Sequence, residues 1–190
     1  ESFARLNCQI ELCDVKADSG QLDLADLEMR ISEAQSISPT QRIIVAIVHL
    51  FGNCPDMEKL TQLSQEYGFL IIEDAAQAHG SFFGEQRLGS FGLVSSFSFY
   101  PGKNLGAFGD GGAVVTNSPN LATKIRALAD HGQIIKDSHD FIGINSRLDT
   151  IQALSLSLKL EYLDEWNQMR RSLANIYINN LSNCAEVNLL

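Results

Sequence analysis

The feature of this sequence that most constrains its fold is the alternation of short apolar runs with longer amphipathic segments. Segments 23–36 and 56–67 carry apolar residues at the spacing of a helix that covers a sheet. The runs 42–48 and 69–73 have the length of strands, and the continuous apolar run 42–48 predicts a strand buried on both faces. Strands and helices that alternate in this way build a largely parallel sheet with helices on its faces. We therefore predict an α/β fold.

The same patterns continue along the rest of the chain. Further strands are predicted at 9–15, 93–99 and 112–116. Gly68 is expected to end the helix 56–67 in the left-handed conformation. The segment 148–181 is helical in pattern almost without interruption, which predicts one long helix. Since no internal repeat or linker is evident, we assign one domain to residues 1–190.

Charge and composition exclude several classes of protein. The net charge of -9 argues against a nucleic-acid-binding protein, because such proteins need a basic surface that displaces counterions. No apolar stretch approaches the roughly 20 residues of a membrane-spanning helix. The four cysteines form neither a CxxC pair nor a Cys/His cluster at zinc spacing, so we expect no metal site and read them as reduced thiols of a cytoplasmic protein.

A first candidate motif is the segment 73–80, EDAAQAHG, which follows the apolar strand 69–73. Ligands of open α/β sheets bind at the carboxyl ends of the strands. Asp74 at that position could hold a cationic ring nitrogen, and the small alanines around it would let a flat ligand approach. For an isolated Asp after a strand, however, capping of the following turn is the more common role.

A second candidate motif is the segment 96–106, SFSFYPGKNLG, in which a strand ends in a Pro-Gly turn that presents Lys103. A lysine among Gly, Ala, Leu and Phe residues is a candidate Schiff-base nucleophile, although most loop lysines are simply solvated. The hydroxyl of Ser98 is a reasonable ligand for a phosphate. Farther along, the segment 143–149, GINSRLD, offers Asn145 and Arg147 as anion ligands.

Together these motifs closely resemble the DegT-type family of sugar aminotransferases. The resemblance rests on EDAAQAHG, SFSFYPGKNLGAFGDGGAVVTN, LADHGQ and GINSRLDTIQA, in this order and spacing, and it covers essentially the whole chain. It implies the large domain of a fold-type-I enzyme that depends on pyridoxal phosphate (PLP), with a mixed, mostly parallel sheet and helices on both of its faces. Residues 1–190 would be the middle part of that domain, truncated at both ends, and the helix 148–181 would lead towards a missing C-terminal small domain.

The resemblance also implies a role for each matching residue. Lys103 would form a Schiff base with PLP and later move a proton between cofactor and substrate. Asp74 would pair with the protonated pyridine nitrogen, and Gln77 would lie near the 3-hydroxyl of the ring. Ser98 would bind the phosphate group, and Asn145 would reach the phosphate of the other subunit's cofactor. The enzyme would accordingly be a homodimer with shared active sites.

Within the family, the pairing of FYPGKNLGAFGDGGA with NSRLD most resembles the enzymes that aminate the 3-keto position of nucleotide-diphosphate hexoses. The expected reaction is the transfer of an amino group, with glutamate as the expected amino-acid donor, in the biosynthesis of amino sugars for surface polysaccharides or glycosylated metabolites. Asp137 departs from the family pattern, in which an aromatic residue is common, and we expect this change to alter the substrate contacts there.

The sequence bears on four alternatives to a C3 sugar aminotransferase. A sugar dehydratase of the same family typically has His at the position of Lys103, so transamination is favoured. A dinucleotide-binding domain would need G-x-G-x-x-G between its first strand and helix, and that motif is absent. An inactive or regulatory PLP-binding protein stays open, as does an enzyme that aminates C4 instead of C3.

Overall fold

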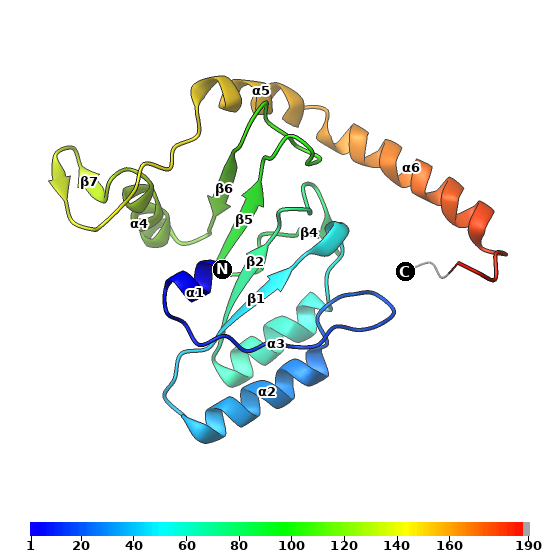
Figure 1. The fold of residues 1–190 in the computed structure, drawn as a ribbon, viewed down its shortest axis with the longest axis horizontal. Coiled ribbons are helices and arrows are strands. Elements are labelled where there is room, and N and C mark those ends of the chain that lie inside the picture. The colour runs from blue at the N-terminus through cyan, green and yellow to red at the C-terminus, as the bar shows by residue number, and fades with distance from the viewer. Residues whose placement is uncertain (188–190) are drawn as a thin grey trace.

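The centre of the molecule is a four-stranded mixed sheet in a computed structural model that describes residues 1–187 (Figure 1). The strand order is β1-β2-β5-β6, with β1 (Ile44–Val48), β2 (Leu70–Asp74), β5 (Val94–Ser98) and β6 (Gly112–Val115). The first three strands are parallel, and β6 pairs antiparallel with β5. The mixed, mostly parallel sheet expected from the sequence is therefore confirmed.

Two helices pack side by side against one face of this sheet, α2 (Leu24–Ile37) and α3 (Met57–Tyr67) (Figure 1). Short-range sequence signals set the ends of α3. The side chain of Asp56 caps its first turn by accepting a hydrogen bond from the Lys59 amide, and Gly68 ends it in the left-handed conformation at φ 71°. The prediction for Gly68 is thus confirmed.

Strand β1 is buried on one face only, which corrects the expectation for the run 42–48. Val45 and Ile47 face α2 and α3, whereas Ile44 and Val48 keep 47% and 54% of their surface exposed. The residues of a strand point alternately to the two faces of the sheet, so a continuous apolar sequence does not by itself bury both faces.

The remaining elements are short or lie at the periphery of the sheet. They are α1 (Ser2–Arg5), η1 (Leu50–Gly52), β3 (Phe82–Phe83), β4 (Gln86–Arg87), α4 (Pro119–Ala129), β7 (Gln133–Ile135), β8 (Ser138–His139), α5 (Thr150–Leu160) and α6 (Leu163–Leu181). Within residues 1–187, no helix is both long enough and apolar enough to span a membrane.

The strand predicted at 9–15 does not form. Only Val15 pairs, in an isolated bridge with Leu22. Local bonds use the backbone instead, because the Asp14 amide donates to the side chain of Asp26 in α2 at 2.8 Å and the Asp14 carbonyl accepts from the Asp23 amide at 3.0 Å. An alternating sequence makes a strand only where a neighbouring strand supplies partners.

The single helix predicted over 148–181 is also wrong, because the chain turns between α5 and α6. The break falls at Glu161 and Tyr162, where the Tyr162 amide bonds to the Lys159 carbonyl at 3.1 Å. No Pro or Gly marks the position. The change of direction buries Leu156 of α5 and Leu163 of α6 in one cluster, so tertiary packing overrides the local helical pattern.

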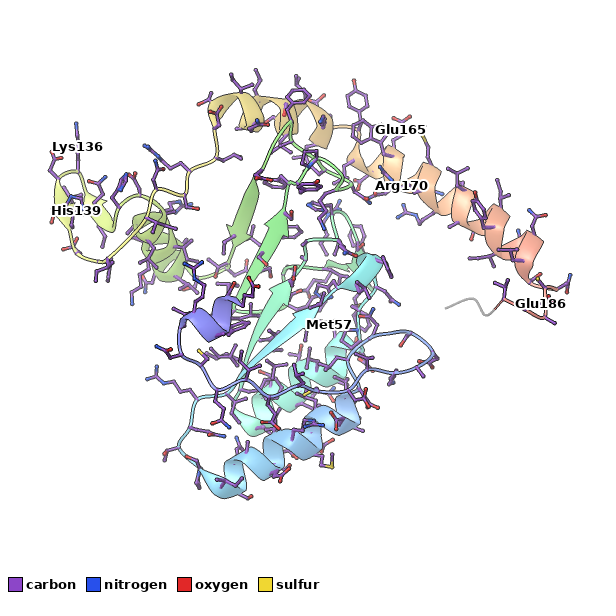
Figure 2. The ribbon with its side chains drawn as sticks, in the orientation of Figure 1. Met57, Lys136, His139, Glu165, Arg170 and Glu186 are labelled. Atoms are coloured by element: carbon purple, nitrogen blue, oxygen red, sulfur yellow. The ribbon has the colours of Figure 1, made fainter. Side chains whose placement is uncertain are left out.

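In the described part of the chain, residues 1–187, the hydrophobic core consists of two clusters. The larger one fills the space between the sheet and the helices α2 and α3, and it contains Met57, which Figure 2 shows between them and which has no exposed surface. The smaller one joins Leu105 and Ala107 to Leu156 and Leu163. The second cluster therefore ties the segment that follows Lys103 to the helices α5 and α6.

Candidate active site

The candidate residues from the sequence gather at the carboxyl ends of β2 and β5. Asp74 is the last residue of β2 and pairs in register with Ser96 of the neighbouring parallel strand. Ser98 lies two residues farther along β5, so its side chain is on the same face of the sheet as that of Ser96. The fold thus brings Asp74 and Ser98 to one edge, as expected for an open α/β sheet.

Asp74 is half-buried and caps the turn that follows it. Its Oδ1 accepts a hydrogen bond from the Ala76 amide at 3.0 Å, which is the simpler role that an Asp after a strand predicts. Within residues 1–187, its second oxygen, Oδ2, takes no hydrogen bond or ion pair. The carboxylate therefore fixes the turn and keeps one oxygen for a ligand.

Gln77 holds a strained turn at the carboxyl end of β1. Its side chain is exposed, and Oε1 accepts a hydrogen bond from the Phe51 amide at 2.9 Å. Phe51 has φ 56°, a conformation that is uncommon for a residue other than glycine, and 83% of its surface is exposed. Such strain is concentrated at functional sites, and no sequence motif indicates it at this position.

Lys103 lies in a tight turn, residues 99–107, that follows β5. We call this segment the lysine turn. The Lys103 amide donates to the Tyr100 carbonyl at 2.9 Å. Gly106 packs against Pro101 so closely that a Cβ on Gly106 would lie 2.8 Å from the Pro101 carbonyl carbon. Only glycine fits that position, so the glycine after Lys103 serves the closure of the turn.

Helix α5 supports the lysine turn through two hydrogen bonds, one to Gly106 within the turn and one to Phe108, which directly follows it. The Nζ atom of Lys159 donates to the Gly106 carbonyl at 2.6 Å, and the Phe108 amide donates to Oε1 of Gln152 at 2.8 Å. Both bonds satisfy backbone groups of a loop that would otherwise need water. The conformation of the lysine turn therefore depends on a helix about 50 residues farther along the chain.

His79 is buried beside the lysine turn. Its ring has 4% exposure and packs against the rings of Phe97 and Phe99, at centroid distances of 5.5 and 6.0 Å. Burial lowers the pKa of His79, and the nearby charge of Lys103 lowers it further, against the opposing effect of the Ser98 backbone. Among the described residues, both ring nitrogens of His79 are buried without a hydrogen-bond partner. We infer that His79 is neutral near pH 7 and supports the turn by packing against the two phenylalanine rings.

Glu73 precedes Asp74 and points to the opposite, buried face of the sheet. Its carboxylate has no exposed surface and lies 2.8 Å from Nε2 of His49. It also accepts a bond from the Ser95 hydroxyl at 3.1 Å. Three backbone amides of the loop 89–92 donate to it as well, those of Gly89, Phe91 and Gly92, at 2.7, 2.8 and 2.5 Å. Sequence reasoning missed this hydrogen-bond network around Glu73, which fixes the strand end that carries Asp74.

The hydrogen bonds of Glu73 set the direction of its pKa. Burial raises the pKa of the carboxyl, but the bonds from His49, Gly92 and Gly89 outweigh this effect and leave the pKa below its usual value of 4.5. A carboxyl with a lowered pKa in the folded state stabilises the fold fully at pH values above 4.5. That stabilisation is lost as the pH falls through the folded-state pKa.

We expect Glu73→Gln to destabilise the complete protein. The complete protein here means the product of the whole coding sequence in which this chain lies. An amide cannot accept all of these bonds, so buried donors lose their partner at a cost of about 3 kcal/mol. Denaturant unfolding at pH 7 measures the loss. The exposed Glu66→Gln is the matched control. The difference in the free energy of unfolding between wild type and Glu73→Gln should shrink below pH 4.5. Equal stability of Glu73→Gln and Glu66→Gln at pH 7 would contradict the stabilising role of the Glu73 hydrogen bonds.

Asn145 does not join the other candidate residues. It is exposed and pairs with Asp130 after α4, and its Oδ1 accepts a hydrogen bond from Nε of Arg147 at 3.0 Å. The structure therefore places it apart from the edge that carries Asp74 and Lys103. Asp149 caps the helix that follows.

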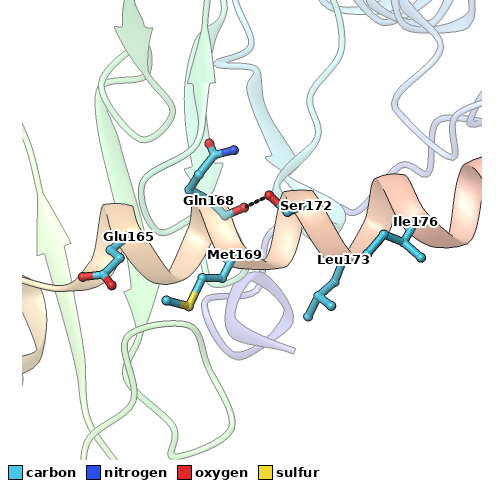
Figure 3. A pocket seen from close by; sticks show the side chains of 6 residues that line it. All are labelled: Glu165, Gln168, Met169, Ser172, Leu173 and Ile176. Atoms are coloured by element: carbon cyan, nitrogen blue, oxygen red, sulfur yellow. Dashed lines mark hydrogen bonds between the residues drawn. The ribbon is translucent and has the colours of Figure 1, made fainter.

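A shallow pocket lies on α6, away from these residues. It is lined by Glu165, Gln168, Met169, Ser172, Leu173 and Ile176 (Figure 3). All six belong to one helix, and the backbone carbonyl of Gln168 accepts a bond from the Ser172 hydroxyl at 3.0 Å. None of the candidate residues lines this pocket. The candidate site is therefore the strand edge and not this hollow.

A family model for the DegT/DnrJ/EryC1/StrS aminotransferases matches residues 1–190, the whole chain. The chain belongs to this family. Its sheet and helices accordingly have the α/β architecture of a fold-type-I aminotransferase.

Individual members of the DegT/DnrJ/EryC1/StrS family are similar to the chain over most of its length. The dTDP-3-amino-3,4,6-trideoxy-alpha-D-glucose transaminase of Streptomyces venezuelae is 46% identical over 155 residues, which cover 82% of this chain and 41% of that protein. A protein of Geobacillus stearothermophilus named pleiotropic regulatory protein is 39% identical over 176 residues, 93% of this chain and 45% of that protein.

A solved structure in this group carries a cofactor. The crystal structure of NtdA from Bacillus subtilis with bound cofactor PMP superposes with a TM-score of 0.79 at 30% identity, covering 92% of this chain and 39% of that chain. The chain spans less than half the length of each of the two curated relatives described above.

Proposed function

We propose that the complete protein is a PLP-dependent aminotransferase that transfers an amino group from glutamate to the C3 keto group of a nucleotide-diphosphate-linked sugar. The observation that carries this proposal is the placement of Lys103 in a closed turn beside the strand edge that holds Asp74 and Ser98. The printed name of the Streptomyces venezuelae relative, a 3-amino sugar transaminase, supports the substrate class.

The residues at this edge fit PLP by their chemistry. The unused oxygen of Asp74 suits a protonated ring nitrogen, and the Ser98 hydroxyl suits a phosphate. Within residues 1–187, the side-chain nitrogen of Lys103 makes no hydrogen bond or ion pair, so it is available to an aldehyde. The three groups would hold the ring, the phosphate and the aldehyde carbon of the cofactor.

Each residue then has a defined task. PLP, when bound, supplies an electron sink for the electron pair left when a substrate C–H bond loses its proton. Lys103 would attach the cofactor and later move that proton as a free amine. Asp74 would keep a proton on the ring nitrogen, and Gln77, at the neighbouring turn, would lie near the 3-hydroxyl.

The dimer is a further part of the proposal. Asn145 is exposed and lies apart from the Asp74 edge of its own chain. We propose that in a homodimer with shared active sites Asn145 of the partner subunit binds the cofactor phosphate. An exposed amide on an irregular segment before α5 is free to make such a contact across an interface.

A regulatory role is the second candidate, and the name of the Geobacillus stearothermophilus relative favours it. One experiment distinguishes the enzymatic from the regulatory role, and it also distinguishes amination at C3 from amination at C4. The complete protein is incubated with PLP, glutamate and matched 3-keto and 4-keto nucleotide sugars, and the products are analysed by mass spectrometry and NMR. We expect a 3-amino sugar. Amination of only the 4-keto sugars would overturn the assignment of C3 as the aminated carbon. PLP binding without any amination would favour the regulatory role.

A further inference from the structure

Helix α6 carries a buried polar residue that the proposed chemistry does not use. Most residues of α6 are exposed, but Asn167 keeps only 7% of its surface exposed. Its Nδ2 donates to the His79 carbonyl at 2.8 Å, and its Oδ1 accepts from Nδ2 of Asn104 at 2.8 Å. A carbonyl can only accept, so these two bonds fix the orientation of the Asn167 amide.

These bonds join two segments of the candidate site. His79 belongs to the segment 74–80, which begins with Asp74 and includes Gln77, and Asn104 directly follows Lys103. Gly80 permits the close approach of the helix, since a Cβ there would lie 2.7 Å from Nδ2 of Asn167. One buried amide therefore bridges the strand end that carries Asp74 and the turn that carries Lys103.

We propose that Asn167 is a positioning residue that holds the lysine turn in register with the segment 74–80. This inference rests on the proposed function, because the register matters for the fit of a cofactor between Asp74 and Lys103. Asn167 is buried, and both polar atoms of its side chain already bond to the protein, so we assign it a supporting role and not that of a ligand. A site held to within a fraction of an ångström needs such supporting contacts.

The test compares Asn167→Ala with Asn180→Ala in the complete protein. Asn180 is an exposed residue of the same helix, and within residues 1–187 its side chain bonds only to the Ile176 carbonyl of that helix. The first measurement is hydrogen exchange without cofactor. We expect amides in 75–80 and 100–107 to exchange about tenfold faster in Asn167→Ala, the factor for one lost hydrogen bond, with other segments unchanged.

The second measurement is a titration of each variant with PLP, followed by visible absorbance. We expect the Kd for PLP to rise about tenfold in Asn167→Ala and kcat to fall, with the KM for glutamate unchanged. Asn104→Ala removes the other arm of the bridge and serves if Asn167→Ala does not fold. The double variant should lose no more than Asn167→Ala alone, because both arms act through one amide.

The outcomes separate this inference from the proposed function. Equal exchange and equal Kd in Asn167→Ala and Asn180→Ala would overturn the positioning role, and so would faster exchange spread evenly over the chain. Failure of the wild-type protein to bind PLP would overturn the proposed function. In that case the exchange measurement would still decide whether Asn167 couples the two segments.

Discussion

Replacing Lys103 with alanine in the complete protein is expected to abolish both the visible absorbance of bound PLP and the transfer of the amino group. Lys103 is the one candidate whose side-chain nitrogen both attaches the cofactor and moves the proton in the proposed reaction. Losing both tasks should slow turnover by at least about 10³-fold, which corresponds to about 4 kcal/mol. Absorbance spectra and single-turnover rates measure the two effects.

The control for this variant is Lys124→Ala. Lys124 is exposed on α4 and lies outside the candidate site, so both spectrum and rate should stay at wild-type values. A Lys103→Ala protein that keeps the absorbance band and turns over normally would show that another lysine carries the cofactor. The lysine turn would then have only a structural role.

Replacing Asp74 with asparagine should have a different result, because it leaves the attachment of the cofactor intact. A carboxylate beside a ring nitrogen favours its protonated form, and a neutral amide gives no such stabilisation. We expect the absorbance band to remain and transamination to slow by roughly 10²-fold, or about 3 kcal/mol of transition-state stabilisation. The bond to the Ala76 amide can be kept by the amide oxygen, so the turn should survive.

The exposed Asp18→Asn serves as the matched control for a charge lost at the surface. Its turnover should equal that of the wild type. If Asp74→Asn also turns over at a near-wild-type rate, another group protonates the ring. The placement of the strand-end carboxylate under the cofactor would then be wrong.

Local signals explain why part of the fold could be predicted from sequence. Gly68 ends α3 as expected. A signal of the same kind begins α4, where Ser118 accepts a hydrogen bond from the Leu121 amide and Pro119 stands at the first helical position. These features depend on a few neighbouring residues. The strand predicted at 9–15 and the continuous helix 148–181 failed because both depend on partners distant in sequence, which a local pattern does not reveal.

The same distinction applies to the site. Asp74, Ser98 and Lys103 stand at strand ends that the apolar runs mark, so their placement at one edge followed from sequence. Glu73 and Asn167 were missed, although each left a signal. Glu73 alternates with the buried Ile71 in a strand, and Asn167 lies one turn after the buried Leu163 in a helix. A polar residue on a buried stripe indicates a specific bonding partner, but the partner itself is visible only in the structure.

The most direct test of the central claim is to trap the cofactor on the complete protein. Wild-type protein is loaded with PLP, reduced with borohydride, digested and mapped by mass spectrometry, with the glutamate-treated protein as a parallel sample. We expect a pyridoxyl-phosphate group on Lys103 alone, and its loss from the sample exposed to glutamate before reduction. An unmodified Lys103 peptide beside a modified lysine elsewhere would contradict it.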